Sequence, residues 1–136
     1  MKTMLSREIR QAEEDHRPEK IMDALKVGVD AMMKYGGATP GDRTMLDALY
    51  PAFKAFSEFL LKNTLMPLKA FEMATIAAEE GAKATVAMAA MAGRASYVAK
   101  EQLVHPDPGA HAVGIIFRAI YQAALAVCHE MGYKEE

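Results

Sequence analysis

The chain has 136 residues and a formal net charge of −2, from 16 Lys and Arg residues and 18 Asp and Glu residues. Hydrophobic residues make up 51% and charged residues 25%, which argues against wholesale disorder and against a basic nucleic-acid-binding protein. The single cysteine, Cys128, excludes an intramolecular disulfide and a cysteine-based zinc site, and it fits a reducing, cytoplasmic location.

The first segment of the chain differs in composition from the rest. Ten of the first twenty residues are charged, so residues 1–17 are predicted to form a charged arm or surface helix, followed by a helical domain over 18–136. The start of the chain does not resemble a signal peptide. The most apolar run, Ala112–Cys128, contains Arg118 and Gln122 and is too short to predict a membrane span, so no membrane partner is expected.

The first predicted helix covers residues 18–35. Pro18 suits the first turn, where its missing N–H is no loss, and Gly36 and Gly37 are predicted to end the helix because glycine adopts the left-handed C-terminal conformation. Asp42 is the predicted N-cap of the second helix. Pro51 is predicted to kink that helix or split it near Tyr50.

The third predicted helix runs from Pro67 to about Ala92, and nine of its last nineteen residues are alanine, which predicts close approach of its neighbours. A long connection over 93–109 leads to the last helix, about Gly109 to Met131, with Asp107 as its predicted N-cap and Pro108 at its first position. This last helix is apolar on nearly every face, so it is predicted to be central and buried. The predicted fold is all-α, an antiparallel bundle of four or five helices.

Two glycine-containing loops, 36–45 and 93–110, lead into helix N-termini, where free N–H groups attract anions. The alternative is that both loops are only caps and turns. Other chemistries find less support. The four histidines have no metal-ligand spacing, and Cys128 lies in an apolar stretch typical of a core. No metal site and no catalytic residue is predicted.

Three segments resemble the nucleotide-binding domain of dihydroxyacetone (glycerone) kinases: GDRTMLDALYPA at 41–52, GRASYV at 93–98 and DPGA at 107–110. That domain is a separate L subunit in phosphotransferase-dependent bacterial systems and the C-terminal domain of single-chain ATP-dependent kinases. The order and intervals of the three motifs also match. The resemblance implies part of an antiparallel eight-helix barrel that binds ADP or ATP at one end, while another domain or subunit carries dihydroxyacetone.

The resemblance also implies roles for individual residues. The backbone of Gly36 would meet the nucleotide, Met45 would pack on the adenine, and Arg94 and the Asp107–Gly109 turn would border the pocket. A thioether packs well on an aromatic face, and a guanidinium pairs with phosphate. The candidate nucleotide-contacting residues are Gly36, Thr44, Met45, Arg94, Asp107, Pro108 and Gly109.

The chain departs from the family pattern in three respects. It lacks the D-G-D-H-G motif that supplies the magnesium ligands, and it lacks the Ser-Ser-Gly segment that contacts phosphates. Ala99, Lys100 and Glu101 replace the L-G-E-R sequence of bacterial L subunits. An N-terminally truncated domain is therefore expected, in which Mg²⁺ ligands are absent and kinase activity of the fragment alone is not expected. The alternative function is a standalone helical interaction or regulatory module. Such a module is expected to form a homodimer along the open seam of the incomplete barrel.

Overall fold

The computed structural model describes residues 18–91, 97 and 104–135, and the predicted N-terminal arm and Arg94 lie outside these residues. Four α-helices make up most of the described chain: α2 (Pro18–Gly36), α3 (Leu46–Lys62), α4 (Pro67–Ala84) and α5 (Pro108–Glu130). A short 3-10 helix, η1 (Thr85–Ala87), extends α4. The described residues contain no strand, so the all-α prediction is confirmed.

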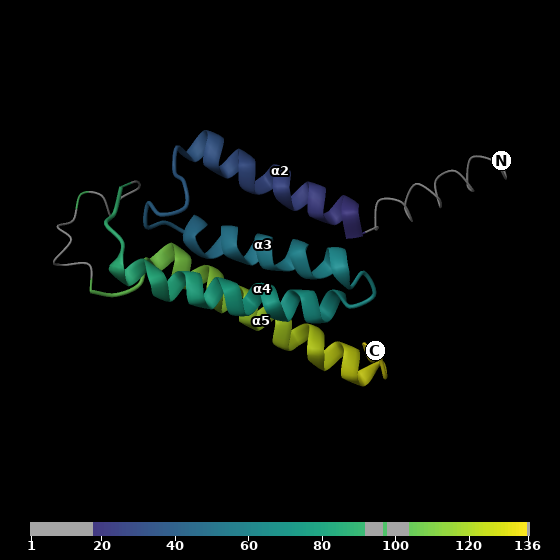
Figure 1. Ribbon diagram of the computed structural model, residues 1–136. Coiled ribbons are helices and arrows are strands. Elements are labelled where there is room, and N and C mark those ends of the chain that lie inside the picture. Colours follow the sequence, from purple (N-terminus) through teal and green to yellow (C-terminus); the bar gives the residue numbers. More distant parts are fainter. Residues whose placement is uncertain (1–17, 92–96, 98–103, 136) are drawn as a thin grey trace, which may run out of the picture.

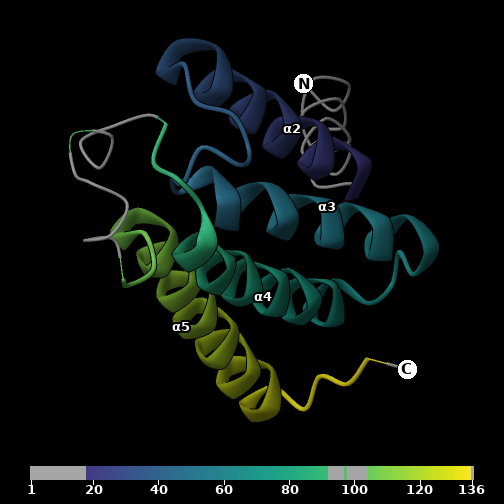
Figure 2. The same ribbon diagram turned by 60° about the vertical axis from the view of Figure 1, so that its left-hand side comes forward.

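The helices follow one another in an antiparallel array (Figure 1). Helix α3 packs between α2 and α4, and α4 in turn contacts α5, which also touches α3. Figure 2 shows α5 crossing the bundle on the side away from α2. The described helices therefore form an open layer with α2 and α5 at its two edges.

A stripe of alanines forms the contact between α3, α4 and α5. Helix α4 buries Ala70, Ala74, Ala78 and Ala82, spaced four residues apart on one face. Because these side chains are short, the helix backbones approach closely, as the alanine content predicted. The closest approach is at Gly81, where an added Cβ would lie 2.1 Å from the main-chain oxygen of Asp47 in α3.

Most predicted helix ends are confirmed because their signals are local. Gly37 has φ +69° and donates its N–H to the Met33 carbonyl at 3.1 Å, which ends α2. Pro67 begins α4 and Pro108 begins α5. Asp107 is the N-cap of α5, and its carboxylate accepts the Ala110 N–H at 3.0 Å.

The predicted N-cap of the second helix is wrong. Asp42 instead accepts the N–H and hydroxyl of Thr39 within the loop, and α3 begins only after Met45. The reason lies in the next residue: Arg43 has φ +62°, and this left-handed conformation cannot start a right-handed helix.

Of the two outcomes predicted at Pro51, a kink or a split, the split does not occur, because α3 runs unbroken from Leu46 to Lys62 with Pro51 inside it. Pro51 has no N–H to donate to the Asp47 carbonyl one turn earlier. That carbonyl lies at the closest approach to Gly81 in α4, so the oxygen that proline leaves free is at the interhelical contact.

Helix α4 ends earlier than predicted, at Ala84 rather than near Ala92, and Met88 is extended.

The burial of α5 also differs from the prediction. Its buried residues are Ala110, Val113 and Gly114 near its start, whereas Ile116, Ile120 and Val127 are more than half exposed. Among the described helices, α5 is long and apolar enough to cross a membrane. Core helices of soluble proteins meet the same two criteria of length and composition, so this finding is weak evidence for a membrane span.

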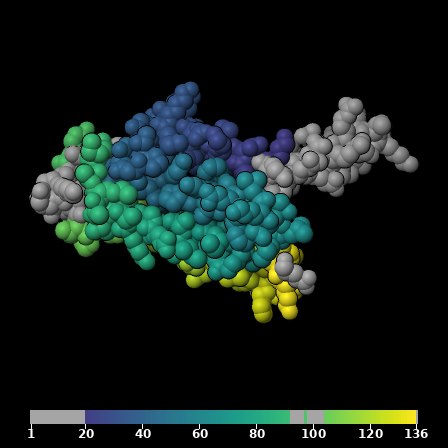
Figure 3. All heavy atoms as spheres, viewed as in Figure 1, coloured from purple at the N-terminus to yellow at the C-terminus, as the bar shows by residue number. Residues whose placement is uncertain are grey.

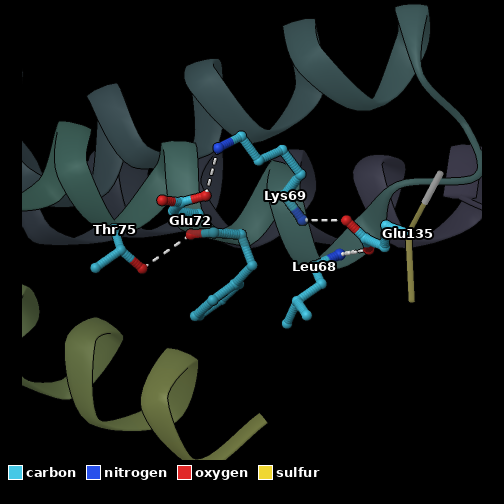
Figure 4. A network of polar contacts seen from close by, with 6 residues as sticks. Leu68, Lys69, Glu72, Thr75 and Glu135 are labelled. Atoms are coloured by element: carbon cyan, nitrogen blue, oxygen red, sulfur yellow. Dashed lines mark hydrogen bonds and ion pairs between the residues drawn. The ribbon is translucent and has the colours of Figure 1, made fainter. Parts of the chain in front are cut away.

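The C-terminal tail returns to the start of α4. The Glu135 carboxylate accepts the main-chain N–H groups of Leu68 and, at 2.8 Å, Lys69 (Figure 4). These N–H groups have no intrahelical acceptor, and Met66 at the N-cap offers no side-chain bond. Glu135 therefore replaces the missing cap, and the side chain of Lys69 pairs with Glu72 one turn further along.

Candidate functional site

The described parts of the two loops singled out in the sequence lie at the same end of the bundle. Loop 37–45 joins α2 to α3, and the segment after η1 leaves α4 at this end, where residues 104–107 also lead into α5 (Figures 1 and 3). A main-chain hydrogen bond from the Met91 N–H to the Asp42 carbonyl, 3.0 Å long, joins the first loop to the segment that follows η1. Arg43 in the same loop bonds to the His105 carbonyl in the second loop, so the described parts of the candidate site are connected.

Met45 meets the first turn of α5. A Cβ built on Gly109 would lie 3.3 Å from the Met45 Cβ and 3.1 Å from a carboxylate oxygen of Asp107. Only glycine allows the two chain segments to come this close without displacement. Met45 remains 41% exposed, so part of its side chain is accessible beside the Asp107–Gly109 turn.

The structure brings together some of the candidate residues. Thr44 is half-buried beside Met45, and its hydroxyl accepts the Leu46 N–H at 3.2 Å. Pro108 occupies the first turn of α5 and is exposed. Gly36 is the last residue of α2, and no atom beyond its neighbours along the chain lies within 4 Å of the position of an added Cβ, so its backbone is open on that side.

Arg43 is a buried residue at this end of the bundle that the sequence did not single out. Its side chain is 2% exposed, although arginine is seldom buried. Its Nε donates to the Thr85 carbonyl at 3.0 Å, and Nη2 donates to the His105 carbonyl. The left-handed backbone of a non-glycine residue costs on the order of 1–3 kcal/mol, so these tertiary contacts must hold Arg43 in place.

Two further buried polar side chains organise the same end. The Asp47 carboxylate accepts the N–H groups of Gly41 at 2.6 Å and Thr44 at 2.9 Å, which closes the first loop onto α3. The Thr85 hydroxyl donates to the Ala82 carbonyl and accepts the Asp107 N–H at 2.8 Å. The only signal for them in the sequence is polarity: Asp47 follows the GDRTM segment, and Thr85 interrupts an alanine-rich run.

A groove of about 640 Å³ lies beside this region, between α4 and α5. Pro106 and His111 form its border with the candidate site, and Glu79 and Arg118 form an ion pair along its wall. The guanidinium makes two parallel bonds of 2.8 and 2.7 Å to the carboxylate, and this hydrogen bonding lowers the pKa of Glu79 below its usual value. The pair therefore stays ionised at neutral pH.

The acidic residues of this end are not arranged as metal ligands. Within the described part of the chain, no group of three or more His, Cys, Asp or Glu side chains could hold a metal ion. The carboxylates of Asp42 and Asp47 instead accept N–H groups of the first loop, and that of Asp107 accepts the Ala110 N–H in the first turn of α5. What the site offers a ligand is an accessible thioether, open glycine backbone and the half-buried carboxylate of Asp42.

Comparison with known proteins agrees with the motifs. The family model described as the DAK2 domain matches residues 3–122. Triokinase/FMN cyclase of Mus musculus is 47% identical over 100 residues, which cover 73% of this chain and 17% of that protein. The dihydroxyacetone kinase of Citrobacter freundii is 40% identical over 107 residues, 77% of this chain and 18% of that protein.

A third relative is a separate subunit. The ADP-binding subunit DhaL of the PEP-dependent dihydroxyacetone kinase of Escherichia coli is 33% identical over 114 residues, covering 84% of this chain and 54% of the subunit. The chain thus spans about half of this subunit and less than a fifth of the two longer kinases. Since the family model covers most of the chain, the protein belongs to the DAK2 domain family.

Proposed function

We propose that the chain is the ADP- or ATP-binding portion of a dihydroxyacetone (glycerone) kinase and supplies the adenosine side of the nucleotide site. The observation that carries the proposal is the half-exposed Met45 against the Asp107–Gly109 turn, at the meeting point of two family motifs. A thioether packs favourably on an aromatic ring such as adenine. The relatives are kinases of this type, and the one from Escherichia coli is named as an ADP-binding subunit.

The charges of the site favour the adenosine end of the nucleotide over the phosphates. Asp42, Asp47 and Asp107 bring three carboxylates to this end of the bundle against the one buried guanidinium of Arg43, so a phosphate placed among them would be repelled. A ribose hydroxyl can instead donate to a carboxylate. Gly109, in the first turn of α5, has no intrahelical acceptor for its N–H, which leaves that group free to donate to the ligand.

The remaining nucleotide contacts, Mg²⁺ binding and triose binding are assigned to other residues or to another domain in this proposal. Arg94, outside the described residues, would contact the nucleotide together with Gly36, Thr44 and Pro108. Mg²⁺ accompanies the phosphates in the intact domain, but the described residues do not form a site for it. A separate domain or subunit would hold the triose for phosphoryl transfer in the cytoplasm. This chain alone is accordingly expected to bind nucleotide without kinase activity.

Isothermal titration calorimetry of the chain with ADP tests the proposal. Saturable ADP binding is expected, and adenosine and AMP should compete with ADP because the chain contacts the adenosine side. Omitting Mg²⁺ should change the affinity little for the same reason. A folded chain that releases no heat with ADP and fails to retain the nucleotide in equilibrium dialysis contradicts the proposal.

Replacing Met45 by aspartate should weaken ADP binding by about tenfold or more, near 1.4 kcal/mol. The change removes the apolar contact with adenine and adds a charge near Asp107. Because Met45 is 41% exposed, the melting temperature should change little. Met45→Leu, which conserves volume and apolar character, is the control and should bind normally. If Met45 only fills the core, the aspartate variant will lose stability and keep its ADP affinity.

Replacing Arg94 by lysine in the intact kinase should weaken ATP binding about tenfold, because lysine keeps the charge but lacks the planar guanidinium fork. Thermal stability should hardly change. A side chain that only complements a helix dipole would tolerate this substitution, since the dipole responds to charge alone. Unchanged ATP affinity would therefore exclude a fork contact of Arg94 with the nucleotide.

Assembly is a separate part of the proposal. Ile116, Ile120 and Val127 are more than half exposed on α5, at one edge of the open helical layer. Exposed apolar surface of this kind is a typical interaction site, so we expect the isolated chain to form homodimers. Light scattering at high micromolar concentration should give twice the mass of the chain, and a monodisperse monomer would contradict the expectation.

A further inference from the structure

Arg43 occupies a position from which it can control the whole candidate site. Its guanidinium joins the first loop to the end of α4 through Thr85 and to the second connection through His105. These partners are 42 and 62 residues away in the chain. Within the described residues both partners are main-chain carbonyls, so the guanidinium is fixed by the geometry of its N–H groups and not by an ion pair.

The contacts of Arg43 continue into the residues that would touch the ligand. Thr85, whose carbonyl accepts from Arg43, also accepts the Asp107 N–H through its hydroxyl. Asp107 caps α5 and thereby orients Gly109, while Met45 follows Arg43 by two residues and packs against Gly109. Arg43 thus lies on the inner side of the site, between the loop that carries Met45 and the Asp107–Gly109 turn. The spacing of these two segments determines whether both can contact the same ligand.

We propose that Arg43 is a positioning residue that sets nucleotide affinity by holding the Met45 loop and the Asp107–Gly109 turn at a fixed separation. The inference rests on the proposed function. Arg43 does not contact the nucleotide in this scheme. Position 43 requires a planar side chain whose N–H groups point at two different carbonyls. The single ammonium group of a lysine there does not reproduce this geometry.

The first test is the substitution of Arg43 by lysine in the complete chain, with ADP affinity measured by calorimetry. Affinity should fall about tenfold, because charge is kept and only the fork is lost. Exchange of the Met91 and Asp107 amide protons, followed by NMR, should become faster, since both amides bond across the linkage that Arg43 maintains. Arg118→Lys is the matched control, because that fork binds Glu79 on the groove wall and its loss should leave ADP affinity unchanged.

A second variant separates positioning from a general loss of stability. Arg43→Gly removes the side chain and relieves the left-handed backbone, so the loop can keep its path. Added methylguanidinium should restore ADP binding to this variant as its concentration rises, whereas methylammonium, with equal charge and no fork, should not. A purely structural loss would show no such selectivity.

The outcomes are distinct. A wild-type chain that binds no ADP contradicts the proposed function. A wild-type chain that binds ADP, together with a folded Arg43→Lys variant that binds it equally well, contradicts only the role of Arg43. Failure of methylguanidinium to restore binding to folded Arg43→Gly also contradicts that role.

Discussion

Replacing Gly81 by alanine is expected to destabilise the protein by about 3 kcal/mol, at the upper end of the usual cost of overpacking. The new Cβ would lie 2.1 Å from the Asp47 carbonyl oxygen and 3.2 Å from the Ala48 Cα, both main-chain atoms of α3. No side-chain rotation relieves such a contact, so α3 and α4 must move apart. Because they share the alanine stripe of the core, their separation exposes apolar surface.

Gly28→Ala is the matched control for this prediction. Gly28 also lies inside a helix, α2, but no atom is within 4 Å of its added Cβ. Alanine there should stabilise the protein by up to about 1 kcal/mol through helix propensity. Urea unfolding followed by circular dichroism measures both variants. Equal stability changes at the two positions would show that the close approach of α3 and α4 does not exist in solution.

Replacing Thr85 by valine is expected to cost about 2 kcal/mol, the penalty for leaving a buried donor unpaired. Thr85 is fully buried, and valine has nearly its shape but no hydroxyl to accept the Asp107 N–H. The N-cap of α5 then loses the contact that fixes its main chain. ADP affinity should fall in parallel, because Asp107 and Gly109 move relative to Met45.

Thr85→Ser separates the hydroxyl from the rest of the side chain. Serine keeps both hydrogen bonds and loses only a methyl group, so its stability loss should be about half that of valine or less, and ADP affinity should be retained. Chemical denaturation gives the stabilities, and calorimetry gives the affinities. If serine proves as damaging as valine, packing of the methyl group and not the hydroxyl is what Thr85 contributes.

Long-range contacts explain why the site was predicted only in part. Met45 and the Asp107–Gly109 turn were identifiable from motifs, and the structure places them together. Arg43 lies in the same GDRTM motif, but nothing in its neighbourhood along the chain indicates burial. Its partners are the carbonyls of Thr85 and His105, and a main-chain carbonyl has no sequence signature.

The apolar sequence of α5 was misleading for a related reason. Apolar composition on all faces indicates that a helix could be buried, but burial also requires neighbours on each face. Here α5 has α4 and α3 on one side and lies at the edge of the layer, so Ile116 and Ile120 remain exposed. The composition of a helix does not determine how many other helices pack against it.

The sequence by itself determined the helical class, the ends set by Gly37 and Pro67, and the N-cap at Asp107, because each depends on backbone preferences within a few residues. Only the tertiary structure decided where α3 begins and where α4 ends. The left-handed conformation of Arg43 delays α3 until after Met45, and the Thr85 carbonyl bonds to Arg43 at the point where α4 gives way to η1. Both boundaries lie at contacts of Arg43, whose buried guanidinium has partners far away in the chain, and no local propensity encodes those contacts.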